Sequence, residues 1–256
     1  MKNNNQTLSY DDVLLKPQYS DIRSRTEIDI SADLGNGVVL QLPIFSSPMD
    51  TISESAMANT MSNTGASAII HRYNTVNEQI NQINKVSSPR IVGGAIGISG
   101  DYLERASALV EAGCEYLCVD VAHGHHIMMK EALTNLRKLF GPNYHIMAGN
   151  VATLEGINDL SDWGADSVRC NIGGGSICST RIQTGHGMPG LQTIFECAKT
   201  DRDVKIIADG GIKNSGDMVK ALAAGADAVM VGSLLAGTSE TPGEIIRTGP
   251  IPRPRN

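Results

Sequence analysis

Cys178 lies where a cysteine can act as a nucleophile. It belongs to the glycine-rich stretch 173–181 (GGGSICSTR), which follows a predicted strand. A cysteine in such a loop is open to solvent and close to backbone dipoles, which favour the reactive thiolate. The chain has five cysteines, an odd number that indicates free thiols in a reducing cytoplasm. The other four fall in helix or strand patterns and are expected to be buried and inert: Cys114, Cys118, Cys170 and Cys197.

Three glycine-rich loops predict a phosphate site. They cover residues 171–181, 208–212 and 232–237, each directly after one of the last three predicted strands. Glycine lets backbone N–H groups approach and surround an anion, and the late loops of a barrel are its usual phosphate site. Asp209, at the end of a strand, can accept hydrogen bonds from ribose hydroxyls, or else serve as a turn or helix-capping residue.

A cluster of histidines raises the question of a metal. His123, His125 and His126 are close in sequence, but no second group of ligands stands at metal-binding spacing. We therefore expect no metal and assign these residues to a surface or pocket-lining loop.

The elements that must position these residues alternate between strands and helices. Helical spacing with a final glycine marks residues 54–65, 101–113, 126–141 and 214–225. Gly113, Gly164 and Gly225 each precede a strand and are expected to have positive φ. The pattern predicts parallel βαβ units in a (β/α)8 barrel, with an open doubly wound sheet as the alternative. The predicted strands are 42–47, 66–71, 90–97, 115–121, 145–150, 166–172, 204–209 and 227–233.

Composition and length agree with one barrel domain. The 256 residues carry a net charge of −6, which argues against a nucleic-acid partner. No apolar stretch is long enough to span a membrane and the start has no signal-peptide core, so we expect a cytoplasmic protein. We divide the chain into a capping segment (1–40), the barrel (41–246) and an irregular proline-rich tail (247–256). The part after the eighth strand is too short for a full last helix and a flap.

Several motifs resemble the IMP dehydrogenase/GMP reductase family. The similarity runs from about residue 8 to residue 246, and GSICSTR followed by ADGG and GSLLAG is its most specific part. The motifs that carry it are YDDVLLKPQYSDIRSR, SSPMDTISE, GNVAT, GGGSICSTRIQTGHG, ADGGIKNSGDMVKALAAGADAVMVGSLLAG and TPGE.

The resemblance implies a role for each matching residue. Cys178 would attack C2 of a purine nucleoside monophosphate (GMP, IMP or XMP), and Thr180 would assist at the leaving group or water. Asp209 would hold the ribose, while Asp120 and Asn150 would face the nicotinamide cofactor and the base. The remaining residues would line the nucleotide pocket and hold the phosphate: Ser47, Met49, Gly175, Ser176, Gly210, Gly211, Gly232 and Ser233.

Two reactions share this covalent intermediate in the family. IMP dehydrogenase oxidises IMP to XMP with NAD and water, whereas GMP reductase converts GMP to IMP and ammonia with NADPH. The stretch 83–94 (INKVSSPRIVGG) passes from helix to strand without the regulatory CBS pair of the dehydrogenases, which slightly favours the reductase. The resemblance also implies a homotetramer and allows a monovalent cation near the Cys178 loop.

The chain departs from the family pattern at several positions. The family sequence GIGPGS is NIGGGS here, with Asn171 and Gly174 in place of glycine and proline, and Val121 replaces a common hydroxyl residue. The family's flap with an Arg–Tyr pair and its late glutamate find no match, so the catalytic base is expected to be missing, truncated or supplied by another chain. The alternatives are a nucleotide-binding barrel without turnover, a fragment of a longer enzyme, or an unrelated phosphate-binding barrel, which would leave Cys178 unexplained.

Overall fold

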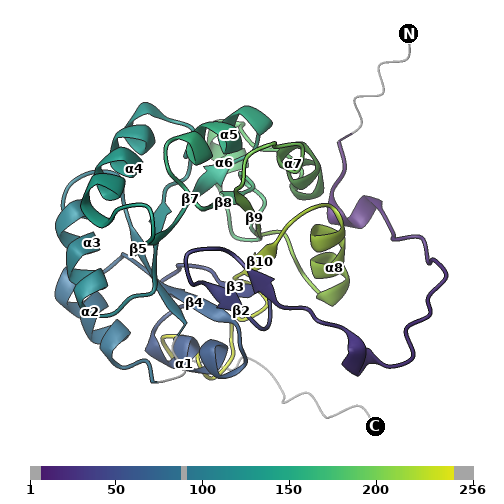
Figure 1. Cartoon of the computed structure of the whole chain (residues 1–256), viewed down its shortest axis with the longest axis horizontal. Helices are drawn as coiled ribbons and strands as arrows, with labels where there is room; N and C mark the ends of the chain where they lie inside the picture. Colours follow the sequence, from purple (N-terminus) through teal and green to yellow (C-terminus); the bar gives the residue numbers. More distant parts are fainter. Residues whose placement is uncertain (1–6, 88–90, 245–256) are drawn as a thin grey trace.

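The protein is a closed parallel barrel of eight strands surrounded by helices (Figure 1). A computed structural model describes residues 7–87 and 91–244. All neighbouring strands pair in parallel in the order of the sequence, and β10 closes the ring against β3. This confirms the predicted (β/α)8 barrel and excludes the open sheet. The strands are β3 (Ile44–Ser46), β4 (Ser67–Ile70), β5 (Val92–Ile96), β6 (Tyr116–Asp120), β7 (His145–Val151), β8 (Ser167–Cys170), β9 (Lys205–Asp209) and β10 (Ala228–Val231).

Helices form the outer layer, and four of them begin at a side-chain cap. Thr75 and Glu78 form a capping box at the start of α2. Gly113, Gly164 and Gly225 have φ of 84°, 113° and 115°, as predicted from their positions before strands. The helices are α1 (Ser55–Asn63), α2 (Val76–Asn84), α3 (Tyr102–Glu111), α4 (Ile127–Phe140), α5 (Leu154–Asp162), α6 (Thr180–Thr184), α7 (Gly190–Cys197) and α8 (Ser215–Ala223).

Two connections bear on the sequence predictions. Helix α2 ends at Asn84 and β5 begins at Val92, so no further domain is inserted between them. After β10, the described chain up to residue 244 forms turns and bends and no helix. The proposed tail, residues 247–256, lies outside the described residues. Within the described ranges, none of the helices has the length and apolar character needed to cross a membrane.

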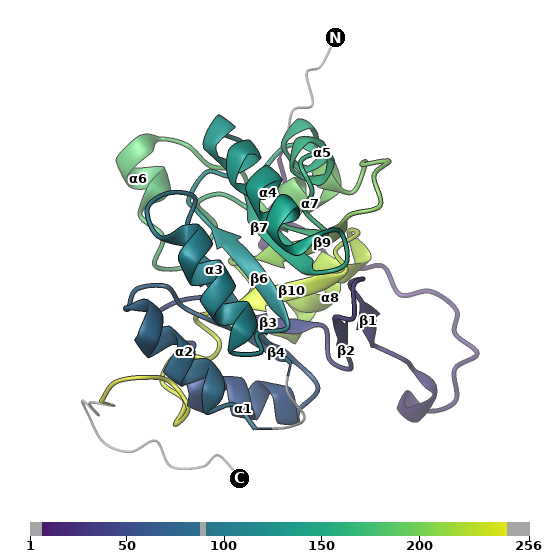
Figure 2. The ribbon, with the colours of Figure 1, turned by 60° about the vertical axis from the view of Figure 1, so that its left-hand side comes forward.

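A hairpin lies against the amino-terminal end of the barrel. It pairs β1 (Ala32–Asp33) with β2 (Val39–Leu40), and Leu34, Val38 and Leu40 are buried together with inward-facing strand residues. Figure 2 shows this hairpin and α6 on opposite sides of the molecule. The carboxyl ends of the strands, on the α6 side, are therefore left open for a site.

The segment before the hairpin extends away from the barrel. It contains two short 3-10 helices, η1 (Tyr10–Asp12) and η2 (Arg25–Glu27). Tyr10 is buried, and Lys220 of α8 donates from Nζ to the Tyr10 carbonyl (2.8 Å), which ties η1 to α8. Between η1 and β1 the chain loops outward beyond α8 (Figure 1).

Candidate functional site

A cavity of about 720 Å³ opens at the carboxyl ends of the barrel strands. Its size is that of a small-molecule or cofactor site. The structure brings every sequence-predicted site residue to its wall, although they come from loops spread over the whole barrel. These thirteen residues are Ser47, Met49, Asp120, Asn150, Gly175, Ser176, Cys178, Thr180, Asp209, Gly210, Gly211, Gly232 and Ser233.

Cys178 is exposed in the loop between β8 and α6, and its neighbours suit a nucleophile. Its Sγ lies 3.2 Å from Oγ1 of Thr180, the first residue of α6. Its backbone N–H donates to the carbonyl of Gly175 (3.1 Å), and both residues line the cavity. An accessible thiol beside a hydroxyl can form a covalent bond to a ligand in the cavity.

The other four cysteines are buried, as predicted. Burial raises the pKa of Cys118 to about 12 and raises that of Cys170 well above its ordinary value. A thiol with such a pKa carries almost no thiolate at neutral pH, so these two groups are poor nucleophiles.

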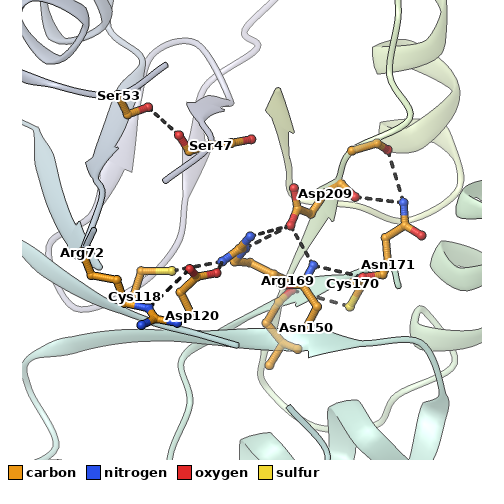
Figure 3. A network of polar contacts seen from close by, with 12 residues as sticks. Ser47, Ser53, Arg72, Cys118, Asp120, Asn150, Arg169, Cys170, Asn171 and Asp209 are labelled. Atoms are coloured by element: carbon orange, nitrogen blue, oxygen red, sulfur yellow. Dashed lines mark hydrogen bonds and ion pairs between the residues drawn. The ribbon is translucent and has the colours of Figure 1, made fainter. Parts of the chain in front are cut away.

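Asp209 is the last residue of β9, and only one of its two carboxylate oxygens accepts hydrogen bonds from the described residues. Oδ2 accepts hydrogen bonds from Asn150 Nδ2 (2.7 Å) and from Arg169 Nε and Nη2 (3.1 and 2.7 Å) (Figure 3). Oδ1 takes no hydrogen bond from the described residues, and Asp209 lines the cavity. The ion pair fixes the side chain and leaves one acceptor for a ligand hydroxyl.

Arg169 is the central site residue that the sequence analysis missed. It lies on β8, is 6% exposed, and connects Asp209 with Asp120, whose Oδ1 accepts from Nη1 (2.5 Å). Burial disfavours its charge, but the two carboxylates raise the pKa of Arg169 well above its ordinary value. The sequence did contain a sign of it. Arg169 follows Ser167 by two residues in a predicted strand, so the two polar side chains lie on the same face of that strand.

Arg72 is a second cation that the sequence analysis did not single out. Its guanidinium lies 5.3 Å from the centre of the Tyr73 ring, and its Nε is 3.8 Å from Asp120 Oδ2. The Nε atom is buried without a hydrogen-bond partner. Both Arg72 and Tyr73 line the cavity, so a positive charge and an aromatic face lie near its mouth.

The glycine-rich loops approach one another at backbone contact distance. A Cβ added to Gly210 would lie 3.3 Å from the nitrogen of Gly175, and one on Gly211 would lie 3.0 Å from the carbonyl oxygen of Gly174. Gly210 and Gly211 also have φ of 83° and 75°, which side chains rarely adopt. Glycine is therefore required where two loops meet in the wall of the cavity.

The three histidines do not lie in the cavity wall. His125 Nε2 lies 2.8 Å from Asp159 Oδ2, and its ring packs against Trp163. His126 caps α4 through Nδ1, which accepts from the N–H of Met128. His123 is exposed. Among the described residues no group of three potential ligands could hold a metal ion.

Comparison with known proteins identifies the family. The model for the IMP dehydrogenase / GMP reductase domain matches residues 7–250. The inosine-5'-monophosphate dehydrogenase of Nitrosopumilus maritimus is 31% identical over 366 aligned positions, covering 93% of this chain and 77% of that protein. The enzyme of the same name from Cryptosporidium parvum is 37% identical over 289 positions, covering 95% and 71%.

A solved structure agrees with the sequence comparison. The crystal structure of inosine 5' monophosphate dehydrogenase from Legionella pneumophila superposes with a TM-score of 0.89 at 47% identity, covering 95% of this chain and 74% of that one. The barrel, the cavity at its carboxyl end and the matched residues lead to one conclusion. The chain belongs to the IMP dehydrogenase/GMP reductase family.

Proposed function

We propose that this protein is an IMP dehydrogenase, which oxidises IMP to XMP with NAD and water. The observation that carries the proposal is the exposed Cys178–Thr180 pair in a cavity shared with the Asp209 carboxylate and three glycine-rich loops. The two curated relatives and the solved structure are all named as IMP dehydrogenases. These names favour the dehydrogenase over the reductase, which the absence of a CBS pair slightly favoured in the sequence.

The nucleotide is held at several points of the cavity wall. Its phosphate is bound by the loops that carry Gly175, Ser176, Gly210, Gly211, Gly232 and Ser233, where backbone N–H groups can reach an anion. The free Oδ1 of Asp209 accepts from the ribose hydroxyls. Ser47 and Met49 support the nucleotide from the loop that follows β3. Because the phosphate is bound far from C2, its binding energy positions the reacting carbon beside the thiol.

The chemistry begins at the sulfur of Cys178. The thiolate adds to C2 of the purine, and the hydrogen on C2 leaves with its electron pair. Water then attacks the same carbon, the C–S bond breaks, and XMP is released with the thiol restored. Thr180, whose Oγ1 is 3.2 Å from the sulfur, is placed to orient the water or the departing thiol.

The residues near Asp120 fit a nicotinamide cofactor. Asp120 Oδ2 takes no hydrogen bond from the described residues and faces Arg72 at the mouth of the cavity. Asp120 and Asn150 would hold NAD, which accepts the hydride when bound. The Arg169 ion pair fixes the direction of the Asp120 carboxylate.

The test is absorbance at about 340 nm in two separate assays of the purified protein. We expect a rise with IMP and NAD, and no change with GMP and NADPH. A fall in the second assay would assign the protein as a GMP reductase instead. No change in either, while IMP still raises the melting temperature, would establish a nucleotide-binding barrel without turnover.

A further inference from the structure

The carboxamide of Asn171 lies between two of the glycine-rich loops. Its Nδ2 donates to the carbonyls of Asp209 (2.9 Å) and Gly210 (3.3 Å), as seen at the right of Figure 3. Asn171 is 4% exposed. On its other side, its side chain faces Gly174, since a Cβ added to Gly174 would lie 2.0 Å from Nδ2. One side chain thus contacts the loop after β8 and the loop after β9 at once.

At Asn171 and Gly174, the residue types do not match what the backbone conformations favour. Asn171 has φ of 153°, in the range that favours glycine, yet it carries a side chain. Gly174 has no positive φ, so its backbone would accept a side chain. The three atoms nearest to a Cβ on Gly174 all belong to Asn171. Glycine is therefore needed at 174 because of Asn171, and the two departures from the family pattern GIGPGS form one coupled change.

The same contacts fix the separation of the loops. The peptide oxygen of Gly174 would be 3.0 Å from a Cβ on Gly211, and the Gly175 nitrogen 3.3 Å from one on Gly210. Both loops line the cavity. A shift of the Asn171 carboxamide would move Gly174 and the 209–210 carbonyls relative to each other, and with them the loop backbone that lines the cavity.

We propose that Asn171 is a positioning residue for the nucleotide phosphate. Its carboxamide occupies the space that a side chain at residue 174 would need. In that place it sets the distance between the loop after β8 and the loop after β9, which together receive the phosphate. It does not touch the base or the ribose in this role. The inference rests on the proposed function, because it assigns the phosphate of a purine nucleotide to these loops.

The test is a double-mutant cycle with two ligands, IMP and inosine, which lacks the phosphate. Asn171→Gly removes the hydrogen bonds to the 209–210 carbonyls and is expected to weaken IMP binding about tenfold. Inosine affinity should stay within about twofold, because inosine lacks the phosphate that the spacing of the two loops is proposed to receive. A general loss of structure would weaken both ligands, so the ratio of the two affinities separates positioning from unfolding.

The second half of the cycle tests the coupling. Gly174→Ala alone places a methyl group against Asn171 and should weaken IMP binding at least about tenfold. In the Asn171→Gly background the same change should alter IMP affinity by less than about twofold. The melting temperatures of the four proteins, measured without ligand, check the coupling even if Gly174→Ala folds poorly. Gly174→Ala should lower the melting temperature strongly in the wild-type background and only slightly in the Asn171→Gly background.

Three results would overturn the inference. Equal losses of IMP and inosine affinity in Asn171→Gly would exclude a role specific to the phosphate. An effect of Gly174→Ala that is the same in both backgrounds would exclude the steric coupling. Wild-type protein that binds neither ligand would overturn the proposed function, and the positioning role with it, whereas the first two results leave that function standing.

Discussion

Arg169 and Asp209 are joined by two hydrogen bonds to a single carboxylate oxygen, at 3.1 and 2.7 Å, inside the mouth of the barrel. Because Nη1 of the same guanidinium binds Asp120, one cation holds two acidic side chains from different strands. Both aspartates line the cavity, and among the described residues neither Asp209 Oδ1 nor Asp120 Oδ2 accepts a hydrogen bond, although Asp120 Oδ2 lies 3.8 Å from Arg72 Nε. The geometry proposed for the ribose and for the cofactor thus depends on a residue that need not touch either.

Replacing Arg169 with methionine should destabilise the protein strongly. The change leaves Asp209 without its counter-charge and leaves Asp120 only Arg72, 3.8 Å away, and loss of one partner of a buried ion pair costs about 3–5 kcal/mol in comparable cases. Urea unfolding of both proteins measures the difference. Arg202→Met is the matched control, because Arg202 also pairs with two aspartates, Asp162 and Asp201, but on the surface. A loss in the control as large as that in Arg169→Met would contradict the argument.

Cys178→Ala should abolish turnover and leave nucleotide binding in place. Without the thiol no covalent adduct at C2 can form, so we expect a fall in kcat on the order of 10³-fold or more. The affinity for IMP, measured by calorimetry, should change little because the phosphate and ribose contacts remain. Cys197→Ala, which removes a buried thiol, is the control and should keep its activity. Full activity in Cys178→Ala would refute the mechanism.

The reactivity of the thiols gives an independent check. Brief treatment of the native protein with iodoacetamide should label Cys178 and spare the four buried cysteines. Bound IMP should slow the labelling, because the cysteine lines the cavity. Peptide mass spectrometry reads both results. Labelling that is unaffected by saturating IMP would place the nucleotide elsewhere.

His145 should make the stability depend on pH. It is buried at the first position of β7. Its Nδ1 lies 3.2 Å from the carbonyl oxygen of Gly35, and its Nε2 lies 2.9 Å from Ser167 Oγ. The neutral ring therefore donates from Nδ1 to the Gly35 carbonyl and accepts at Nε2 from the Ser167 hydroxyl. Burial lowers its pKa. The unfolded chain, with a pKa of about 6.5, then binds a proton that the folded protein does not. The free energy of unfolding should therefore fall as the pH drops below about 7, until the folded-state pKa is reached.

Variants separate this effect from other titrations. His145→Gln should have a weaker dependence of the unfolding free energy on pH between about 7 and 5, measured by urea unfolding. His123→Gln changes an exposed histidine and should keep the wild-type dependence. Identical slopes for wild type and His145→Gln would show that His145 does not contribute.

The extended segment between η1 and β1 should form a contact between copies of the chain. Leu14 is 89% exposed, Tyr19 94% and Ile22 54%, which is a large apolar area for a segment facing solvent. We expect a homo-oligomer by light scattering coupled to gel filtration, in keeping with the homotetramer implied by the family resemblance. Leu14→Ser with Tyr19→Ser should reduce its mass, whereas Leu139→Ser on α4 should not. A monomeric wild-type protein would contradict this prediction.

The barrel could be predicted from sequence because its signals are local. Each strand is a short apolar run, and glycines such as Gly113 mark where the preceding helix ends. Cys178 and Asp209 could be predicted because strand ends converge in this fold. For Arg169 the sequence offered only its place on the same strand face as Ser167, because whether that face points into the barrel depends on closure of the ring. The contact between Asn171 and Gly174 depends on a side chain folding back across a loop, which spacing in sequence does not reveal.

The β1–β2 hairpin bears on how the chain folds. Gly35 contacts His145 across 110 residues, and Asn36 binds Asp166 Oδ1 (3.0 Å) across 130. During synthesis the hairpin leaves the ribosome long before these partners, so the contacts of Gly35 and Asn36 cannot form until His145 and Asp166 have emerged. Contacts between such distant residues form late and slow the folding of a domain. We therefore expect the end of the barrel opposite the cavity to be the last part to become ordered.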